Sequence, residues 1–170
     1  MADVTVGLEC PERGRAGTIG LAASAGVSLL LGLLVYLVDR DWGTVLFLEA
    51  LADRQPALAG VFGPSAPWLP SLFHAYGFAL LIILMLRPRP CASVYGAFGW
   101  FLIAAIMEWL QSAPAERLIL ATHRLLTEGP LPGPVQAYVV YGRFDVGDLL
   151  ATALGCLAAG VAALIVEVSR

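Results

Sequence analysis

The chain contains four apolar stretches that each approach the thickness of a membrane. They cover residues 19–38, 72–86, 94–110 and 149–168. A helix needs about 20 apolar residues to cross the hydrocarbon core of a bilayer. Because lipid offers the backbone no hydrogen-bond partners, helix is the required state of such segments. We therefore predict an all-α integral membrane protein, a four-helix bundle whose spans are joined by one very short and two longer connections.

The composition excludes several classes of protein. Hydrophobic residues make up 59% of the chain and charged residues 14%, whereas a soluble domain usually carries about 25% charged residues. That balance excludes a soluble monomer and a disordered chain. The formal net charge of -3 provides no basic surface for phosphate, so a nucleic-acid partner is excluded as well. The partner that the composition implies is membrane lipid.

The rest of the chain divides into a tail and two longer connections. Residues 1–17 are predicted to form a polar N-terminal tail, and residues 18–170 a single transmembrane domain. In the first longer connection, residues 42–51 could lie as a short helix in the membrane interface. In the extramembrane insert 112–147, residues 115–128 carry apolar side chains on one helical face, which predicts a second interfacial helix. Alternatively, both connections simply cap the bundle.

The arginines indicate the orientation of the chain. There are ten Arg and no Lys, and a four-span topology puts five on each side, so their number alone does not decide. Arg87 and Arg89 lie in the very short second connection, where the positive-inside rule is most reliable. We therefore expect both termini in the cytoplasm and the two longer connections outside.

Small residues recur at helical spacing within three of the spans. They are Ser24, Ser28, Gly32, Gly96, Gly99, Gly155 and Gly160. Small side chains let membrane helices approach one another closely. Tight packing of the bundle is the simplest reason for this pattern.

Polar residues near the ends of the spans are predicted to converge on one membrane face. The third span ends on the side where the second and the fourth begin. The residues concerned are His74, Glu108, Gln111, Arg143, Asp145 and Asp148. An acid at the centre of a membrane helix costs about 2.5–3.5 kcal/mol on insertion scales, and less near the interface. Acids that remain near lipid are therefore usually paired or functional.

Two interpretations of this cluster stay open. In the structural one, Asp145 or Asp148 caps the fourth helix by accepting its free N–H groups. Arg143 then bridges to Glu108 or Asp145 and clasps the third and fourth helices together. Gln111 satisfies an orphan carbonyl in the same clasp. In the functional one, the same side chains line an outward-facing cleft that binds a polar head group or a partner.

Catalysis is a third interpretation, which the sequence does not favour. Two carboxylates and a histidine can perform acid–base chemistry, but no nucleophile stands beside a base in a recognisable spacing. His74 and His123, the only histidines, are not at metal-ligand spacing. No cofactor-binding motif is present. We therefore predict no catalytic residue, no metal and no cofactor, while enzymatic activity itself stays open.

Two segments resemble motifs of the VanZ-like family of small polytopic membrane proteins. Residues 108–111 resemble the family's E-x-x-Q, and residues 143–155 resemble its block of Arg, two Asp, Asn and Gly. In that block Gly155 matches the family's glycine, while Thr152 stands where the family usually has Asn. His74 resembles the histidine at the start of the family's second helix. The link between the two segments is longer than the family's usual link.

The resemblance implies a small multi-pass protein of the bacterial inner membrane. Founding members of the family are linked to resistance to the glycopeptide antibiotic teicoplanin. Our first hypothesis is therefore a non-catalytic VanZ-like protein whose outward polar cluster engages lipid or glycopeptide head groups of the cell envelope. The alternative is an accessory or scaffold subunit of a larger membrane complex, which docks through the 112–147 insert and its lipid-facing helices. An enzyme acting on lipid head groups is the third hypothesis.

Overall fold

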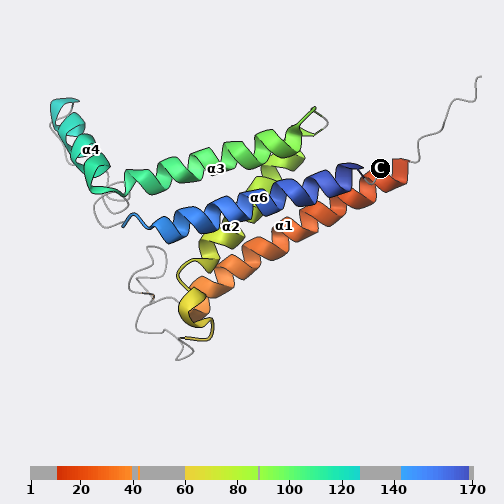
Figure 1. The fold of residues 1–170 in the computed structure, drawn as a ribbon, viewed down its shortest axis with the longest axis horizontal. Helices are drawn as coiled ribbons and strands as arrows, with labels where there is room; N and C mark the ends of the chain where they lie inside the picture. The colour runs from red at the N-terminus through yellow and green to blue at the C-terminus, as the bar shows by residue number, and fades with distance from the viewer. Residues whose placement is uncertain (1–10, 40–41, 43–59, 88, 127–142, 169–170) are drawn as a thin grey trace, which may run out of the picture.

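The structure is a computed structural model that describes residues 11–39, 42, 60–87, 89–126 and 143–168. Within these ranges the chain is helical and contains no strand. Four long helices form the body of the molecule, which confirms the predicted all-α bundle (Figure 1). They are α1 (Pro11–Asp39), α2 (Leu69–Leu86), α3 (Ala92–Leu110) and α6 (Val146–Val168). Two shorter elements are the 3-10 helix η3 (Gly63–Ser65) and α4 (Ala113–Leu126).

All four long helices are long and apolar enough to cross a membrane, as expected of a multi-pass membrane protein. Each begins before the apolar stretch that predicted it, and α1 starts at Pro11 within the expected polar tail. The first turn of a helix tolerates polar side chains and proline, because its N–H groups have no partner inside the helix. In α2, for example, Pro70 lies in the first turn.

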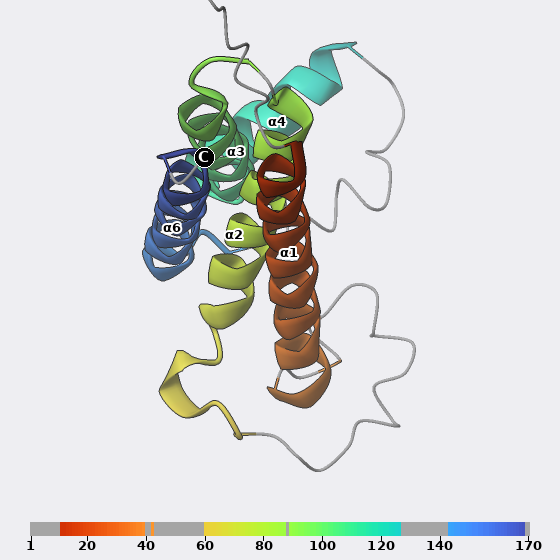
Figure 2. The same ribbon diagram turned by 90° about the vertical axis from the view of Figure 1, so that its right-hand side faces the viewer.

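Helix α2 is at the centre of the bundle. It packs against α1, α3 and α6, whereas α1 and α6 barely contact each other. Figures 1 and 2 show α2 between α1 and α6. Alanines form much of the core, and Ala25, Ala79, Ala159 and Ala163 are completely buried. Such short side chains bring the helix backbones close together, which is how helices associate where lipid removes the hydrophobic driving force.

Most of the predicted small residues lie at these helix contacts. A Cβ atom added to Gly96 would lie 2.5 Å from the Ile83 side chain, and one added to Gly32 would lie 2.6 Å from His74 Nε2. Gly99 is the exception, because a Cβ there would meet nothing within 4 Å in the described part of the chain. The packing prediction is therefore wrong for Gly99.

Besides being small, the two predicted serines form hydrogen bonds between helices. Ser28 donates a hydrogen bond of 2.9 Å from its hydroxyl to the carbonyl of Phe73. The hydroxyls of Ser24 and Tyr76 lie 2.9 Å apart and are hydrogen-bonded. Both contacts join α1 to α2, so the first two spans are held by polar as well as apolar contacts.

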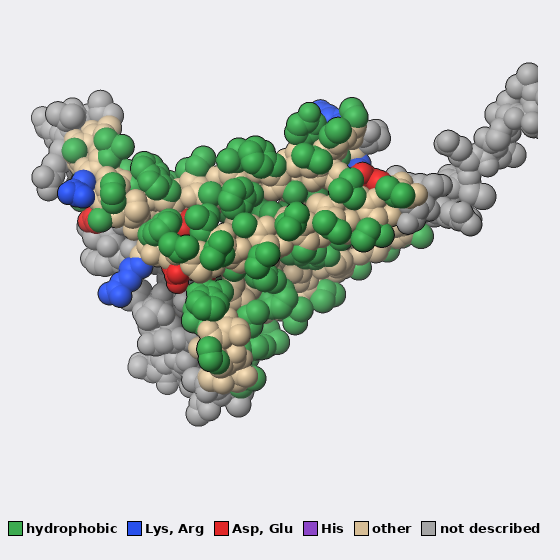
Figure 3. Space-filling view, viewed as in Figure 1, with side chains coloured by type: hydrophobic (Ala, Val, Ile, Leu, Met, Phe, Trp, Pro, Cys, Tyr) green, Lys and Arg blue, Asp and Glu red, His purple; other side chains and the backbone are tan. Residues whose placement is uncertain are grey.

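The surface matches a bundle that is surrounded by lipid. Figure 3 shows hydrophobic side chains along the length of the visible face, with arginine and acidic side chains at its two ends. Helix α3 is the least covered of the four spans, and large side chains such as Phe98, Ile103 and Ile106 are exposed on it. In a membrane these side chains would contact lipid or another membrane helix.

Helix α4 is one of the two predicted interfacial helices, and it begins two residues earlier than the predicted segment 115–128. It lies off the end of α3, outside the bundle (Figure 1). Leu118 on its apolar face is 60% exposed, as an interfacial helix requires. The other predicted helix lies outside the described residues except for Trp42, whose indole N–H donates to the carbonyl of Leu37.

Candidate functional site

A cavity of about 220 Å³ lies among the four long helices near one end of the bundle. Its lining combines aromatic rings, hydroxyls, an imidazole and a carboxylate. These side chains belong to Tyr36 of α1, Ser71, His74 and Phe78 of α2, Trp100 and Glu108 of α3, and Thr152 of α6. Three of the predicted cluster residues, His74, Glu108 and Thr152, therefore line one pocket.

His74 is held in place by neighbours on both sides. Its ring stacks on Tyr36 with centroids 5.7 Å apart and an interplanar angle of 19°. On the same helix, Phe78 is tilted against it at 6.3 Å. Across the helix contact, Gly32 leaves the space that the imidazole fills. The small residue at position 32 thus lets His74 fit between α1 and the pocket.

Aromatic side chains form the part of the pocket farthest from the ends of the helices. Phe78 and Trp100 pack at 4.9 Å between ring centroids, tilted by 41°. They come from α2 and α3, which run side by side. The pocket therefore has an aromatic interior and a more polar rim, where α3 ends and α6 begins.

Glu108 ties the end of α3 to the start of α6. Its Oε1 atom accepts a hydrogen bond of 2.7 Å from the backbone N–H of Asp145. Asp145 in turn caps α6, because its Oδ1 accepts the N–H of Gly147 at 2.7 Å. The predicted cap is present, and Glu108 joins the third and fourth spans through a backbone N–H and not through the predicted bridge from Arg143.

Asp148 ties α6 to α2 one turn further on. The hydroxyl of Ser71 donates to its Oδ1 at 2.7 Å. Gly155, matched to the family glycine, lies so close to the carbonyl of Leu72 that a Cβ atom would collide with it. Thr152 lies between these two positions and is only 8% exposed. The residues of the predicted block thus hold α6 against α2.

Two predicted contributors have other positions. Arg143 is exposed, and no ion pair joins it to Glu108 or Asp145 in the described part of the chain. The predicted arginine clasp is therefore wrong: the backbone N–H of Asp145 is the group that donates to Glu108. Gln111 is the C-cap residue of α3 and does not line the pocket.

Sequence reasoning did not identify Tyr36, Ser71 and Trp100 as site residues. Tyr36 lies three residues before the end of α1, and Ser71 lies in the first turn of α2. Trp100 precedes Glu108 by eight residues, so the two side chains are about 80° apart around α3 and can line the same broad face. That spacing is the signal that could have found Trp100.

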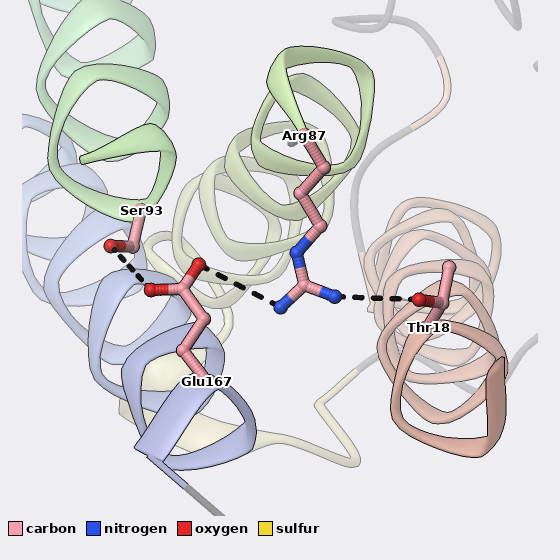
Figure 4. Close-up of polar contacts among 4 residues, drawn as sticks. All are labelled: Thr18, Arg87, Ser93 and Glu167. Atoms are coloured by element: carbon pink, nitrogen blue, oxygen red, sulfur yellow. Dashed lines mark hydrogen bonds and ion pairs between the residues drawn. The ribbon is translucent and has the colours of Figure 1, made fainter. Parts of the chain in front are cut away.

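A second polar cluster lies at the opposite end of the bundle (Figure 4). Arg87 Nη2 and Glu167 Oε1 are 3.7 Å apart, and the two side chains are only 12% and 32% exposed. Ser93 donates to Glu167, and Arg87 donates to Thr18, each at 3.4 Å. These four residues come from α1, the end of α2, α3 and α6, so the ion pair and its two hydrogen bonds together connect all four spans. From the sequence, Arg87 indicated only the orientation of the chain.

An apolar groove of about 340 Å³ lies between α3 and α6. Phe98, Phe101, Leu157 and Val161 are among its lining residues. It contains almost no polar surface, so it fits a hydrocarbon chain or an apolar helix face. Neither the groove nor the pocket gathers three metal-ligating side chains, and none are gathered elsewhere among the described residues.

No protein-family model, curated protein or solved structure matches this chain. What the pocket can do follows from its side chains. It offers a carboxylate, two hydroxyls and an imidazole at the end of four apolar helices, with aromatic rings behind them. Such a lining suits a small polar group that is presented at the boundary between membrane and water.

Proposed function

We propose that this protein binds the polar head group of a membrane lipid, or of a lipid-linked molecule, in the pocket around His74 and Glu108. The observation that carries the proposal is a cavity with a polar rim and an aromatic interior, set among helices that are apolar enough to cross a membrane. Binding pockets are typically apolar with a few convergent polar groups. A lipid reaches such a pocket from the side, through the bilayer.

The role that we propose is binding without catalysis. The polar groups at the rim are engaged with one another: Ser71 donates to Asp148, and Glu108 accepts from the backbone of Asp145. Such contacts fix the shape of the rim. They favour a preorganised binding site, because a preformed pocket costs little ordering entropy when the ligand enters.

We also propose that the chain is a VanZ-like protein of the bacterial inner membrane. Support comes from His74, Glu108, Asp145 and Asp148, which match the family's motifs and gather around one site together with Thr152, which replaces the family's Asn. The two termini belong in the cytoplasm and the pocket faces outward, since Arg87 lies in the short connection at the opposite end. A part in glycopeptide resistance remains a prediction from the resemblance.

The proposal is tested by blocking the pocket. Ala104 lines it, whereas its neighbour Ala105 on the same helix does not. Ala104→Phe should fill the cavity, and Ala105→Phe adds the same ring on another face of α3. Both variants and the unmodified protein are extracted in lipid nanodiscs, and the retained lipids are quantified by mass spectrometry against the bulk membrane.

We expect one lipid class to be enriched with the unmodified protein and with Ala105→Phe, and to lose its enrichment with Ala104→Phe. A lipid composition equal to that of the bulk membrane in all three samples would refute the proposal. Equal enrichment with Ala104→Phe would move the binding site away from this pocket.

The scaffold role is a second candidate, and the apolar groove between α3 and α6 favours it. The occupant that this role predicts is a transmembrane helix of another subunit. Native sizing after mild detergent extraction separates the candidates. A stoichiometric partner that is lost when Val161→Trp fills the groove, but is kept by Ala104→Phe, would support the scaffold; a lone chain would exclude it.

A further inference from the structure

The charge at the pocket end of the bundle limits which head group can bind there. Three acids, Glu108, Asp145 and Asp148, lie at or beside the rim. Among the described residues that line the cavity there is no Arg or Lys. An anionic head group would meet carboxylates at short range, and in such surroundings charge repulsion is only weakly screened.

The interior of the pocket favours a cation as well. The aromatic side chains of Tyr36, Phe78 and Trp100 line the pocket. Aromatic faces attract cations through their quadrupole, and tryptophan does so most strongly. A carboxylate on one side and aromatic faces on the other therefore form a site for a positively charged group.

The hydrogen-bonding groups around the cavity indicate that the positively charged group is a primary ammonium. Oε1 of Glu108 accepts the N–H of Asp145, and the second carboxylate oxygen has further capacity to accept. The hydroxyl oxygens of Ser71 and Thr152 add acceptors on the facing helices. A primary ammonium donates three hydrogen bonds, whereas a quaternary ammonium donates none. A primary ammonium can donate to all three acceptors around the cavity, whereas a quaternary ammonium can donate to none of them.

The size of the cavity and the position of Arg143 define the rest of the ligand. At about 220 Å³ the cavity lies below the roughly 300–1,000 Å³ of pockets for drug-sized molecules, so it matches the size of a small head group. Arg143 is exposed two residues before Asp145, at the start of α6. Its guanidinium is available to the phosphate that lies beside the ammonium in a zwitterionic lipid.

We infer that the pocket selects a phosphoethanolamine-type head group, with its primary ammonium between Glu108 and the aromatic interior and its phosphate toward Arg143. This inference rests on the proposed function and names the ligand class of the same site. It predicts preference for a zwitterionic lipid with a primary amine over an anionic lipid of equal chain length.

The test uses purified, delipidated protein and lipids that differ only in their head groups. Phosphatidylethanolamine, phosphatidylcholine and phosphatidylglycerol with identical chains are titrated in native mass spectrometry, and soluble phosphoethanolamine is titrated as a competitor. We expect phosphatidylethanolamine to bind at least about tenfold more tightly than phosphatidylglycerol, the scale of one cation–π or charge-assisted contact. Phosphatidylcholine should rank between them, and the soluble competitor should act only at far higher concentration.

Glu108→Gln is the matched variant, because an amide oxygen still accepts the N–H of Asp145 while the charge is removed. It should reduce the preference for phosphatidylethanolamine to less than about threefold. Glu116→Gln on α4 makes the same charge change outside the pocket and should leave the preference intact. If Glu108→Gln does not fold, the ranking of lipids on the unmodified protein decides alone.

The outcomes separate the inference from the function on which it rests. Equal or tighter binding of phosphatidylglycerol, still abolished by Ala104→Phe, would overturn the ammonium inference and keep the head-group site. Equally tight binding of soluble phosphoethanolamine would keep the ammonium and overturn the assignment to a membrane lipid. Binding that Ala104→Phe leaves unchanged for every lipid would overturn the proposed function itself.

Discussion

The two ends of the bundle carry polar residues in opposite arrangements. At one end, Arg87 and Glu167 form an ion pair. Ser93 and Thr18 are hydrogen-bonded to this pair, so a single cluster connects all four spans. At the other end, the acids accept hydrogen bonds from a backbone N–H and a hydroxyl and surround a cavity. The same four helices form both ends. The packing of the helices therefore does not by itself explain why the polar residues are arranged differently.

That difference is what we expect if the polar residues at one end maintain the structure and those at the other serve the proposed ligand. Charges beside lipid are costly, so residues with a purely structural role neutralise one another. The ion-paired end meets this requirement within the molecule. At the end with the cavity, the described acids accept hydrogen bonds beside the pocket, and the ligand that we propose there carries a positive charge. The predictions below test this contrast, beginning with the largest effect.

Breaking the ion pair should give the largest loss of stability. Arg87→Ala leaves the half-buried Glu167 without its cation, which we expect to cost about 2 kcal/mol after allowance for the partial exposure of Glu167. The free energy of unfolding is measured by denaturant titration in detergent micelles. Adding Glu167→Gln should restore part of the loss, and strictly additive losses would show that the two residues are not coupled.

The contact between α3 and α6 should give the next largest effect. Glu108→Ala removes the acceptor for the N–H of Asp145, at an expected cost of about 1.5 kcal/mol. Glu108→Gln retains an acceptor and should cost less than about 0.5 kcal/mol. The same unfolding measurement compares the two variants. Equal losses would mean that the charge, and not the hydrogen bond, holds α3 to α6.

The space behind His74 can be filled by one methyl group. Gly32→Ala would push the imidazole toward the pocket, which should destabilise the bundle by about 1 kcal/mol and weaken lipid binding. Gly99→Ala is the control, since nothing among the described residues lies within 4 Å of the added carbon. We expect that change to be neutral or to stabilise the helix by up to about 1 kcal/mol. Identical results for both glycines would contradict the described contact of α1 with His74.

Removing the exposed arginine should have the smallest effect on stability. Arg143→Ala breaks no ion pair with Glu108 or Asp145, so the free energy of unfolding should change by less than about 0.5 kcal/mol. The affinity for a phosphate-bearing lipid should nevertheless fall. A stability loss as large as that of Glu108→Ala would show that Arg143 does clasp the third and fourth spans together.

The sequence predicted the spans and the side on which the acids gather, because both follow from the length of the apolar stretches and the number of crossings. The same reasoning correctly predicted that His74, Glu108 and Thr152 lie near one another. It did not identify Tyr36 and Trp100, because a helix that is apolar on every face does not reveal which side faces the bundle. It was wrong about Arg143, because charge complementarity alone cannot say that a backbone N–H will occupy the same position.

In this account, the two ends of the bundle must lie on opposite sides of the membrane. This is tested most directly by labelling a thiol at each end from one side. Cys91 is exposed in the short connection beside Arg87, and Arg143→Cys puts a thiol at the pocket end; Cys10 and Cys156 are replaced by serine and alanine. An impermeant thiol reagent added to intact spheroplasts should label Arg143→Cys at once and Cys91 only after the membrane is permeabilised. Labelling of both thiols from the same side would contradict the four crossings and, with them, the contrast between the two ends.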